Sequence, residues 1–174
     1  MDQLLEILKY TLPSVVVFIT AYFMLKMFLQ NEEKKRKQEL VLQNQKQITP
    51  LRLQAYERII LFLERISPES LLVRVNNPHY TCRQLQAEML STIRNEFEHN
   101  FSQQLYFSSE TWEVVRNAKG NMVKIINLAA EKVKPESPAI NLSRTILEMV
   151  MEVGKAPTHI AIEVIRKEMQ KIFY

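Results

Sequence analysis

Glu96 and His99, three positions apart in a segment of helical periodicity, are the best candidates for a catalytic or metal-binding pair. That spacing places both side chains on one helix face, as in di-iron carboxylate bundles, where it supplies two metal ligands. Such a site also needs a second copy of the motif and two further carboxylates, and neither other histidine has an acidic residue at that spacing. We therefore predict no metal and no cofactor. The alternative is a helical-bundle enzyme or a metal- or ligand-binding protein that uses Glu96 and His99.

Other catalytic classes have less support in the sequence. Three histidines are scattered outside any nucleophile-elbow motif, and the chain has only two glycines, which excludes a glycine-rich phosphate loop. We predict no catalytic and no cofactor-binding residue, and a protein that is not an enzyme. The segment around Glu96 is then a polar helix face on which Arg94 and Glu98 could pair.

Three smaller features have an ordinary structural interpretation beside a functional one. Cys82 is the single cysteine, which suits a reducing compartment and a small residue at a helix start. Glu148 and Glu152 lie one helical turn apart and form either a solvated face or an acidic docking spot. Three methionines could form an adaptable groove, although helical spacing favours core positions: Met149, Met151 and Met169.

Near its N-terminus the chain has an apolar stretch, Tyr10 to Leu29, whose single charged residue is Lys26. About 20 apolar residues in a helix span a bilayer core, so we predict a single transmembrane helix. Four cations follow at positions 34–37. Because cytoplasmic flanks carry the excess of Lys and Arg, we expect the N-terminus outside and the bulk of the chain in the cytoplasm.

Charge is nearly balanced along the rest of the chain, which has a net charge of +4. Residues 31–46 carry five cations against three anions, and residues 47–174 carry 16 against 14. A nucleic-acid-binding domain would concentrate cations on one face, so we predict no nucleic-acid partner. Three regions are expected: 1–30 as tail and transmembrane helix, 31–48 as a charged juxtamembrane helix, and 49–174 as a cytoplasmic helical domain.

Helix start and stop signals divide the last region. Thr81 with Gln84 is a capping-box pattern, Ser108 or Ser109 is a further cap, and Gly154 is a C-terminal stop. The predicted fold is all-α, with about five main helices, starting near residues 50, 81, 109, 138 and 157, and a short helix from 68. Three of these starts are a hydroxyl residue followed by proline: Thr49-Pro50, Ser67-Pro68 and Ser137-Pro138.

Apolar residues recur at helical spacing in each of these helices. The predicted core positions include Leu53, Tyr56, Ile59, Ile60, Phe62, Leu63, Ile66, Leu85, Met89, Leu90, Ile93, Phe97, Phe101, Val115, Ala118, Met122, Ile125, Ala129, Leu142, Ile146, Met149, Val153, Ala161, Ile165, Met169 and Ile172.

Three segments, together with the N-terminal anchor, resemble an uncharacterised family of bacterial single-pass membrane proteins with a cytoplasmic helical domain. They are ITPLRLQAYERIILFLERISPESLL (48–72), EFEHNFSQQLYFSSETWEVVRNAK (96–119) and NLSRTILEMVMEV (141–153). The resemblance implies architecture and a bacterial inner-membrane location, and it transfers no functional residue.

Position and composition favour a membrane-anchored, non-enzymatic interaction or scaffold protein. It would be a subunit or accessory factor of a cytoplasmic-membrane complex, with a protein partner or further copies of itself docked on the helical domain.

Overall fold

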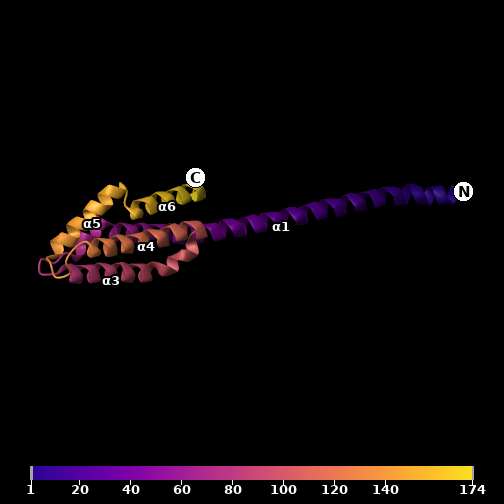
Figure 1. Ribbon diagram of the computed structural model, residues 1–174. Coiled ribbons are helices and arrows are strands. Elements are labelled where there is room, and N and C mark those ends of the chain that lie inside the picture. The colour runs from indigo at the N-terminus through magenta and orange to yellow at the C-terminus, as the bar shows by residue number, and fades with distance from the viewer. Residues whose placement is uncertain (1, 174) are drawn as a thin grey trace. The chain divides into compact units, whose positions relative to one another are not determined.

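The computed structural model describes residues 2–173, and these residues form six α-helices and one 3-10 helix without a named strand (Figure 1). The helices are α1 (Asp2–Arg65), α2 (Pro68–Val75), α3 (Cys82–Asn100), α4 (Ser109–Glu131), α5 (Ala139–Val153) and α6 (Pro157–Phe173), with η1 (Phe101–Tyr106) between α3 and α4. The chain divides into two compact units, residues 1–50 and residues 51–174. The predicted all-α class is confirmed.

The first unit consists of the N-terminal part of α1. From Pro13 to Pro50 its residues are exposed, except for Glu32, which is partly buried. An 18-residue window near the start of this helix has a mean hydropathy of 1.5, and none of its residues is buried. By length and composition, this one helix is long and apolar enough to cross a membrane.

The predicted helix start at Thr49-Pro50 is wrong, because α1 continues through both residues to Arg65. Proline inside a helix removes one backbone hydrogen bond and crowds the carbonyl four residues earlier, at a cost of about 3 kcal/mol. Pro50 is exposed, so water can solvate the carbonyl that loses its partner. Pro50 does lie in a helix, but in the interior of that helix instead of its first turn.

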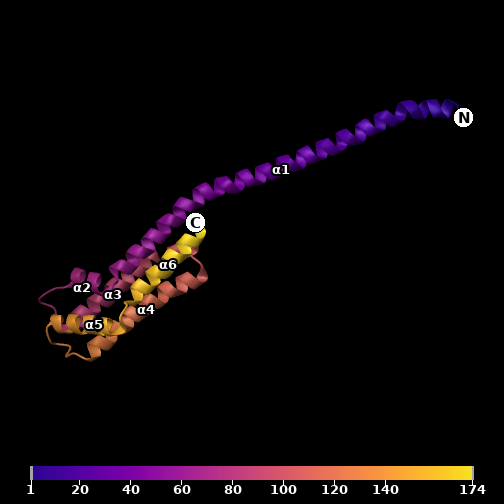
Figure 2. The ribbon, with the colours of Figure 1, turned by 90° about the horizontal axis from the view of Figure 1, so that it is seen from above.

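The second unit is a helical bundle with one apolar core (Figure 2). The C-terminal part of α1 contacts α3 through Phe62 and α6 through Tyr56, and α5 contacts α2, α3 and α4. Every α-helix of this unit contributes buried apolar residues to the core. They include Tyr56, Ile59, Phe62, Leu63, Ile66, Leu71, Leu85, Met89, Ile93, Val115, Met122, Ile126, Leu142, Ile146, Ala161 and Ile165.

Several predicted core positions lie at the edge of the bundle instead. Leu53 is 50% exposed and Val153 is 66% exposed, so neither belongs to the core. Ile60 is only partly buried, whereas the adjacent Ile59 is fully buried. On α4, Ile125 is only partly buried, whereas the adjacent Ile126 is fully buried. Among the other predicted core positions, Phe97, Met149 and Met169 are partly buried and pack against the core. Phe101 lies in η1 and is half exposed. The side chain of Ile172 lies outside the described residues.

Two of the predicted caps form as expected. Thr81 and Gln84 make a reciprocal capping box at the start of α3, and the Ser108 hydroxyl accepts a hydrogen bond from the Thr111 amide at the start of α4. Gly154 ends α5 with a φ of +81°, a conformation that glycine adopts without steric cost. Two other predicted caps do not form: the side chains of Ser67 and Ser137 make no capping hydrogen bond to the helices that follow, α2 and α5.

Ser137 instead helps to join two connections that are distant in the sequence. Its hydroxyl donates to the Lys134 carbonyl and lies 3.2 Å from the Cys82 sulfur. The Cys82 amide donates to the Ser137 carbonyl, and the Ala139 amide donates to the Tyr80 carbonyl. The start of α3 and the α4–α5 connection are therefore fastened together by backbone hydrogen bonds.

Glu168 fastens α6 to the rest of the bundle. Its carboxylate accepts hydrogen bonds from the Tyr56 hydroxyl at 2.8 Å and from the Ser108 hydroxyl at 2.8 Å, and a third from the Ser108 amide. Burial alone would raise the pKa of Glu168, but hydrogen bonds from Thr111, Ser108 and Tyr56 favour the ionised form and hold the pKa below its ordinary value. Burial and the adjacent Glu168 raise the pKa of Tyr56 to about 12.

Candidate functional site

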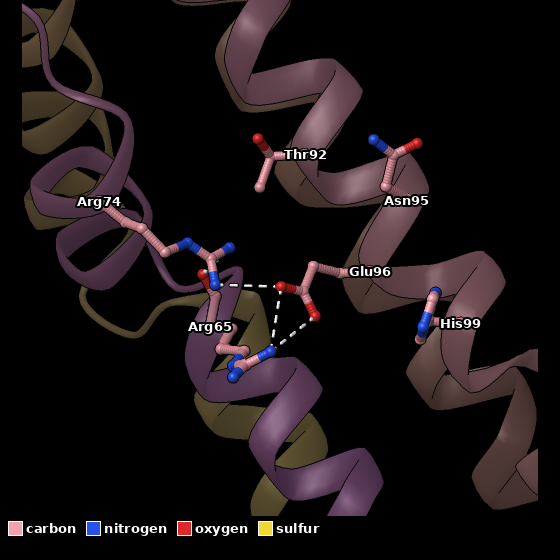
Figure 3. A pocket seen from close by; sticks show the side chains of 6 residues that line it. All are labelled: Arg65, Arg74, Thr92, Asn95, Glu96 and His99. Carbon is pink, nitrogen blue, oxygen red and sulfur yellow. Dashed lines mark hydrogen bonds and ion pairs between the residues drawn. The ribbon is translucent and has the colours of Figure 1, made fainter.

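Glu96 lies in a cleft where the end of α1, the end of α2 and the C-terminal half of α3 meet (Figure 3). The cleft has a volume of about 420 Å³ and is lined by six polar or charged residues: Arg65, Arg74, Thr92, Asn95, Glu96 and His99. Arg65 is the last residue of α1 and Arg74 lies in the last turn of α2. All six residues belong to the second unit, so the cleft is a feature of the bundle itself.

Two arginines hold the Glu96 carboxylate. Nη1 of Arg65 lies 3.3 Å from both carboxylate oxygens, and Nη1 of Arg74 lies 3.1 Å from Oε1. Nη2 of Arg74 also lies 3.5 Å from the Arg65 carbonyl, which is one of the last carbonyls of α1. Figure 3 shows both arginine side chains pointing toward Glu96 from their separate helices. The ion pairs therefore connect three helix segments around one carboxylate.

An aromatic cluster fixes this stretch of α3 within the bundle. The ring of Phe97, the residue after Glu96, lies 5.8 Å from the rings of Phe62, Phe101 and Trp112. Nζ of Lys119 lies 3.9 Å from the Phe97 ring centroid, a cation–π distance. Aromatic pairs in such arrangements contribute about 0.5–1.5 kcal/mol each beyond their burial. The packing of Phe97 thus sets the position of the neighbouring Glu96.

The charge balance of the cleft favours an anion over a metal cation. Two guanidinium groups and one carboxylate leave a net charge of +1, before His99 is counted. A metal ion would have to displace both arginines from Glu96 and would meet their positive charge. Among the described residues, no group of three or more His, Cys, Asp or Glu side chains is placed to hold a metal.

The structure brings Glu96 and His99 to the same cleft but not into contact with each other. His99 is exposed and lies about one helical turn beyond Glu96, and its side chain makes no hydrogen bond to another described residue. Arg94 and Glu98, the pair expected on this helix, form no ion pair within the part of the chain that the structure describes. Four lining residues were not predicted from the sequence: Thr92 and Asn95 on the same helix, and two arginines, which lie 31 and 22 positions before Glu96.

The other candidate residues lie away from this cleft. The Cys82 thiol is buried at the α3 start. Glu148 and Glu152 are not part of the cleft lining; both lie on α5. The three methionines do not share a groove, because Met151 is 80% exposed while two others pack against the core, namely Met149 and Met169.

Comparison with known proteins places the chain in a family without assigning an activity. No curated protein and no solved structure matches the sequence. One family model matches residues 2–172, which is nearly the whole chain and includes both units. The chain therefore belongs to the family of unknown function DUF7935.

Proposed function

We propose that this protein is a membrane-anchored, non-enzymatic scaffold whose helical bundle docks a partner protein at the cytoplasmic face of a bacterial inner membrane. The observation that carries the proposal is the exposed apolar helix between Pro13 and Leu29, which is followed in the same chain by a bundle with its own core. An apolar helix of that length that buries no side chain in the protein is stable where lipid covers it.

The direction of insertion follows from the flanking charge. Lys34, Lys35, Arg36 and Lys37 lie just beyond the span, and none of them is buried. The positive-inside rule then favours a cytoplasmic location for the bundle and an external N-terminus. The same cations could contact anionic lipid headgroups, each contributing about 1 kcal/mol.

The span itself is better suited to localisation than to specific helix pairing. Residues 10–29 contain only four small residues, Thr11, Ser14, Thr20 and Ala21, and no GxxxG motif. The Thr20 hydroxyl already donates within its own helix, to the carbonyls of Val16 and Val17 at 3.0 and 2.9 Å. Restriction to a surface raises the effective concentration of the bundle for other membrane proteins without any new contact.

Exchange of the anchor tests this proposal. Three tagged chains are compared in the native host: the natural protein, a chain with an unrelated span in place of residues 10–29, and residues 51–174 released from the membrane. The proposal expects the first two to recover the same partner, or the same self-assembled species, after gentle detergent extraction, and the third to recover less of it.

Two outcomes count against the scaffold. One is equal recovery from the released bundle, which would make the anchor irrelevant to docking. The other is a bound small molecule or metal at one equivalent per chain whose loss on Glu96→Ala or His99→Ala abolishes the cellular phenotype while partner recovery stays intact, which would favour an enzyme or a ligand-binding protein over a scaffold.

A further inference from the structure

The cleft around Glu96 has more hydrogen-bond donors than its own acceptors use. Arg65 contacts Glu96 through Nη1 alone, so its Nε and Nη2 atoms have no hydrogen-bond partner among the described residues. The side chains of Thr92, Asn95 and His99 also line the cleft without a hydrogen bond to any described residue. Glu96 is the single anionic side chain of the lining, and it faces two cations.

These donors come from separate elements that the fold holds in place. Arg65 ends α1, Arg74 lies in the last turn of α2, and the remaining donors lie on consecutive turns of α3. The Arg74 side chain is 35% exposed and that of Arg65 is 55% exposed, so water and solutes reach both guanidinium groups. A volume of about 420 Å³ has room for a phosphate group together with the small molecule that carries it.

We propose that this cleft binds the phosphate group of a small molecule, with Arg65 and Arg74 as its guanidinium ligands and with Thr92, Asn95 and His99 as further hydrogen-bond donors. Guanidinium groups bind phosphate through paired, charge-assisted hydrogen bonds. A phosphate monoester carries a charge of about −1.5 to −2 at pH 7 and offers three acceptor oxygens. A phosphate therefore balances the positive charge of the two arginines and accepts hydrogen bonds from donors on three helices better than a carboxylate does, since a carboxylate has one charge and two oxygens.

In this site the Glu96 carboxylate competes with the phosphate for the two arginines. Its carboxylate occupies Nη1 of both arginines and repels an incoming anion across the same cleft. Removal of that charge by Glu96→Gln should therefore strengthen phosphate binding by about tenfold or more, because the repulsion between two charges a few ångströms apart is stronger near a protein surface than in bulk water. A residue with a purely structural role would not produce a gain of affinity on removal.

Calorimetric titration of the full-length chain in a non-ionic detergent, with inorganic phosphate as the probe at constant ionic strength, tests the proposal. We expect saturable binding in the millimolar range for the natural protein and tighter binding for Glu96→Gln. Arg65→Ala and Arg74→Ala should each weaken binding by about tenfold or more, because each removes a charge-assisted hydrogen bond. Acetate should bind more weakly than phosphate to every variant.

Matched substitutions on the same helix control for nonspecific charge effects. Arg94 and Glu98 are exposed on α3 and do not line the cleft, so Arg94→Ala and Glu98→Gln should change the affinity by less than about twofold, since solvent and salt screen them. The proposal is overturned if phosphate binding does not saturate, or if Glu96→Gln binds no more tightly than the natural protein. Acetate binding as tight as that of phosphate would overturn the assignment to phosphate.

Discussion

The hydroxyl of Tyr56 donates a 2.8 Å hydrogen bond to the carboxylate of Glu168, across 112 positions of sequence. Tyr56 belongs to the buried face of α1 and Glu168 to α6, and the same carboxylate accepts from Ser108, the cap of α4. A single ionised side chain therefore ties together three helices that are far apart in the sequence. Substitution of Glu168 therefore tests how much these contacts between helices contribute to the stability of the bundle.

Substitution of Glu168 by Gln should lower the free energy of unfolding of the bundle by about 2 kcal/mol, because the neutral amide keeps one acceptor oxygen and replaces the other by an NH2 donor, so the hydrogen bonds from Tyr56 and Ser108 lose their charged acceptor. Chemical unfolding followed by circular dichroism measures the change. The matched control is Glu163→Gln on the same helix, where an exposed carboxylate pairs only with Lys155 among the described residues. A control that destabilises as much as Glu168→Gln would contradict this role.

Stability should depend on pH at both ends of the scale through this pair. The folded-state pKa of Glu168 is lower than its unfolded value, near 4.5, so its contribution is complete above that value and is lost as the pH falls through the folded pKa. The pKa of Tyr56 is raised from 10.0 to about 12, so its contribution is complete below pH 10 and is lost as the pH rises toward 12. Unfolding curves across pH should show a smaller loss of stability in acid for Glu168→Gln, with the part due to the lowered pKa of Glu163 remaining, and a smaller loss in alkali for Tyr56→Phe.

The core on α1 can be tested by two neighbouring substitutions in residues 51–174 expressed alone, which we expect to fold as a soluble helical unit. Ile59 is 1% exposed and Leu61 is 53% exposed. Ile59→Asp should cost more than about 3 kcal/mol, because it buries an unpaired carboxylate, whereas Leu61→Asp should change stability little. Thermal melts distinguish the two. Equal melting temperatures would mean that the packing of α1 given above is wrong.

The two glycines should respond to alanine in opposite directions. Gly154 has a φ of +81°, which alanine adopts only with strain, so Gly154→Ala should destabilise by about 1 kcal/mol. Gly120 lies inside α4 with no neighbouring atom within 4 Å of the place that a methyl group would take, so Gly120→Ala should stabilise by about 0.5–1 kcal/mol. Denaturant midpoints report both changes. A stabilising Gly154→Ala would show that α5 ends in another conformation.

The proposed topology predicts which side of the membrane each end of the span occupies. In a Cys82→Ser background, a cysteine at Gln3 should react with an impermeant thiol reagent on cells without an outer barrier, and a cysteine at Gln38 should react only after lysis. The reason is the excess of cations from Lys34 to Lys37 on one flank. The reverse labelling pattern would place the bundle outside the cytoplasm.

Local sequence signals correctly predicted those helix ends whose hydrogen bonds involve residues close together in the sequence. The Thr81 capping box and the Gly154 stop were both confirmed, because each involves atoms only a few residues apart. The helix start predicted at Thr49-Pro50 was wrong, because the same dipeptide can occur at the first turn of a helix and, when the proline is exposed, in a helix interior. Ser137 failed as a cap because its hydroxyl bonds back to Lys134 and lies against Cys82, which the sequence does not place nearby.

The candidate site shows the same division. Glu96 and His99 were recognised from their spacing on one helix, and they do line one cleft. Their chemical setting was not predictable, because the two arginines that surround Glu96 come from other helices. Without Arg65 and Arg74 the pair suggests a metal, and with them the excess positive charge suggests an anion. Which helix ends converge is decided by tertiary packing, and no local pattern encodes it.

The position of α6 also has a consequence for synthesis on the ribosome. Tyr56 of α1 emerges early, whereas Glu168 of α6, to which it donates a hydrogen bond, emerges about a hundred residues later. At roughly 5–20 residues per second, the interval is on the order of 10 s. During that time part of the apolar face of α1 lacks its final cover and is exposed to chaperones and to other nascent chains. The bundle therefore reaches its closed form only after translation of its last helix, even though its first helix is complete much earlier.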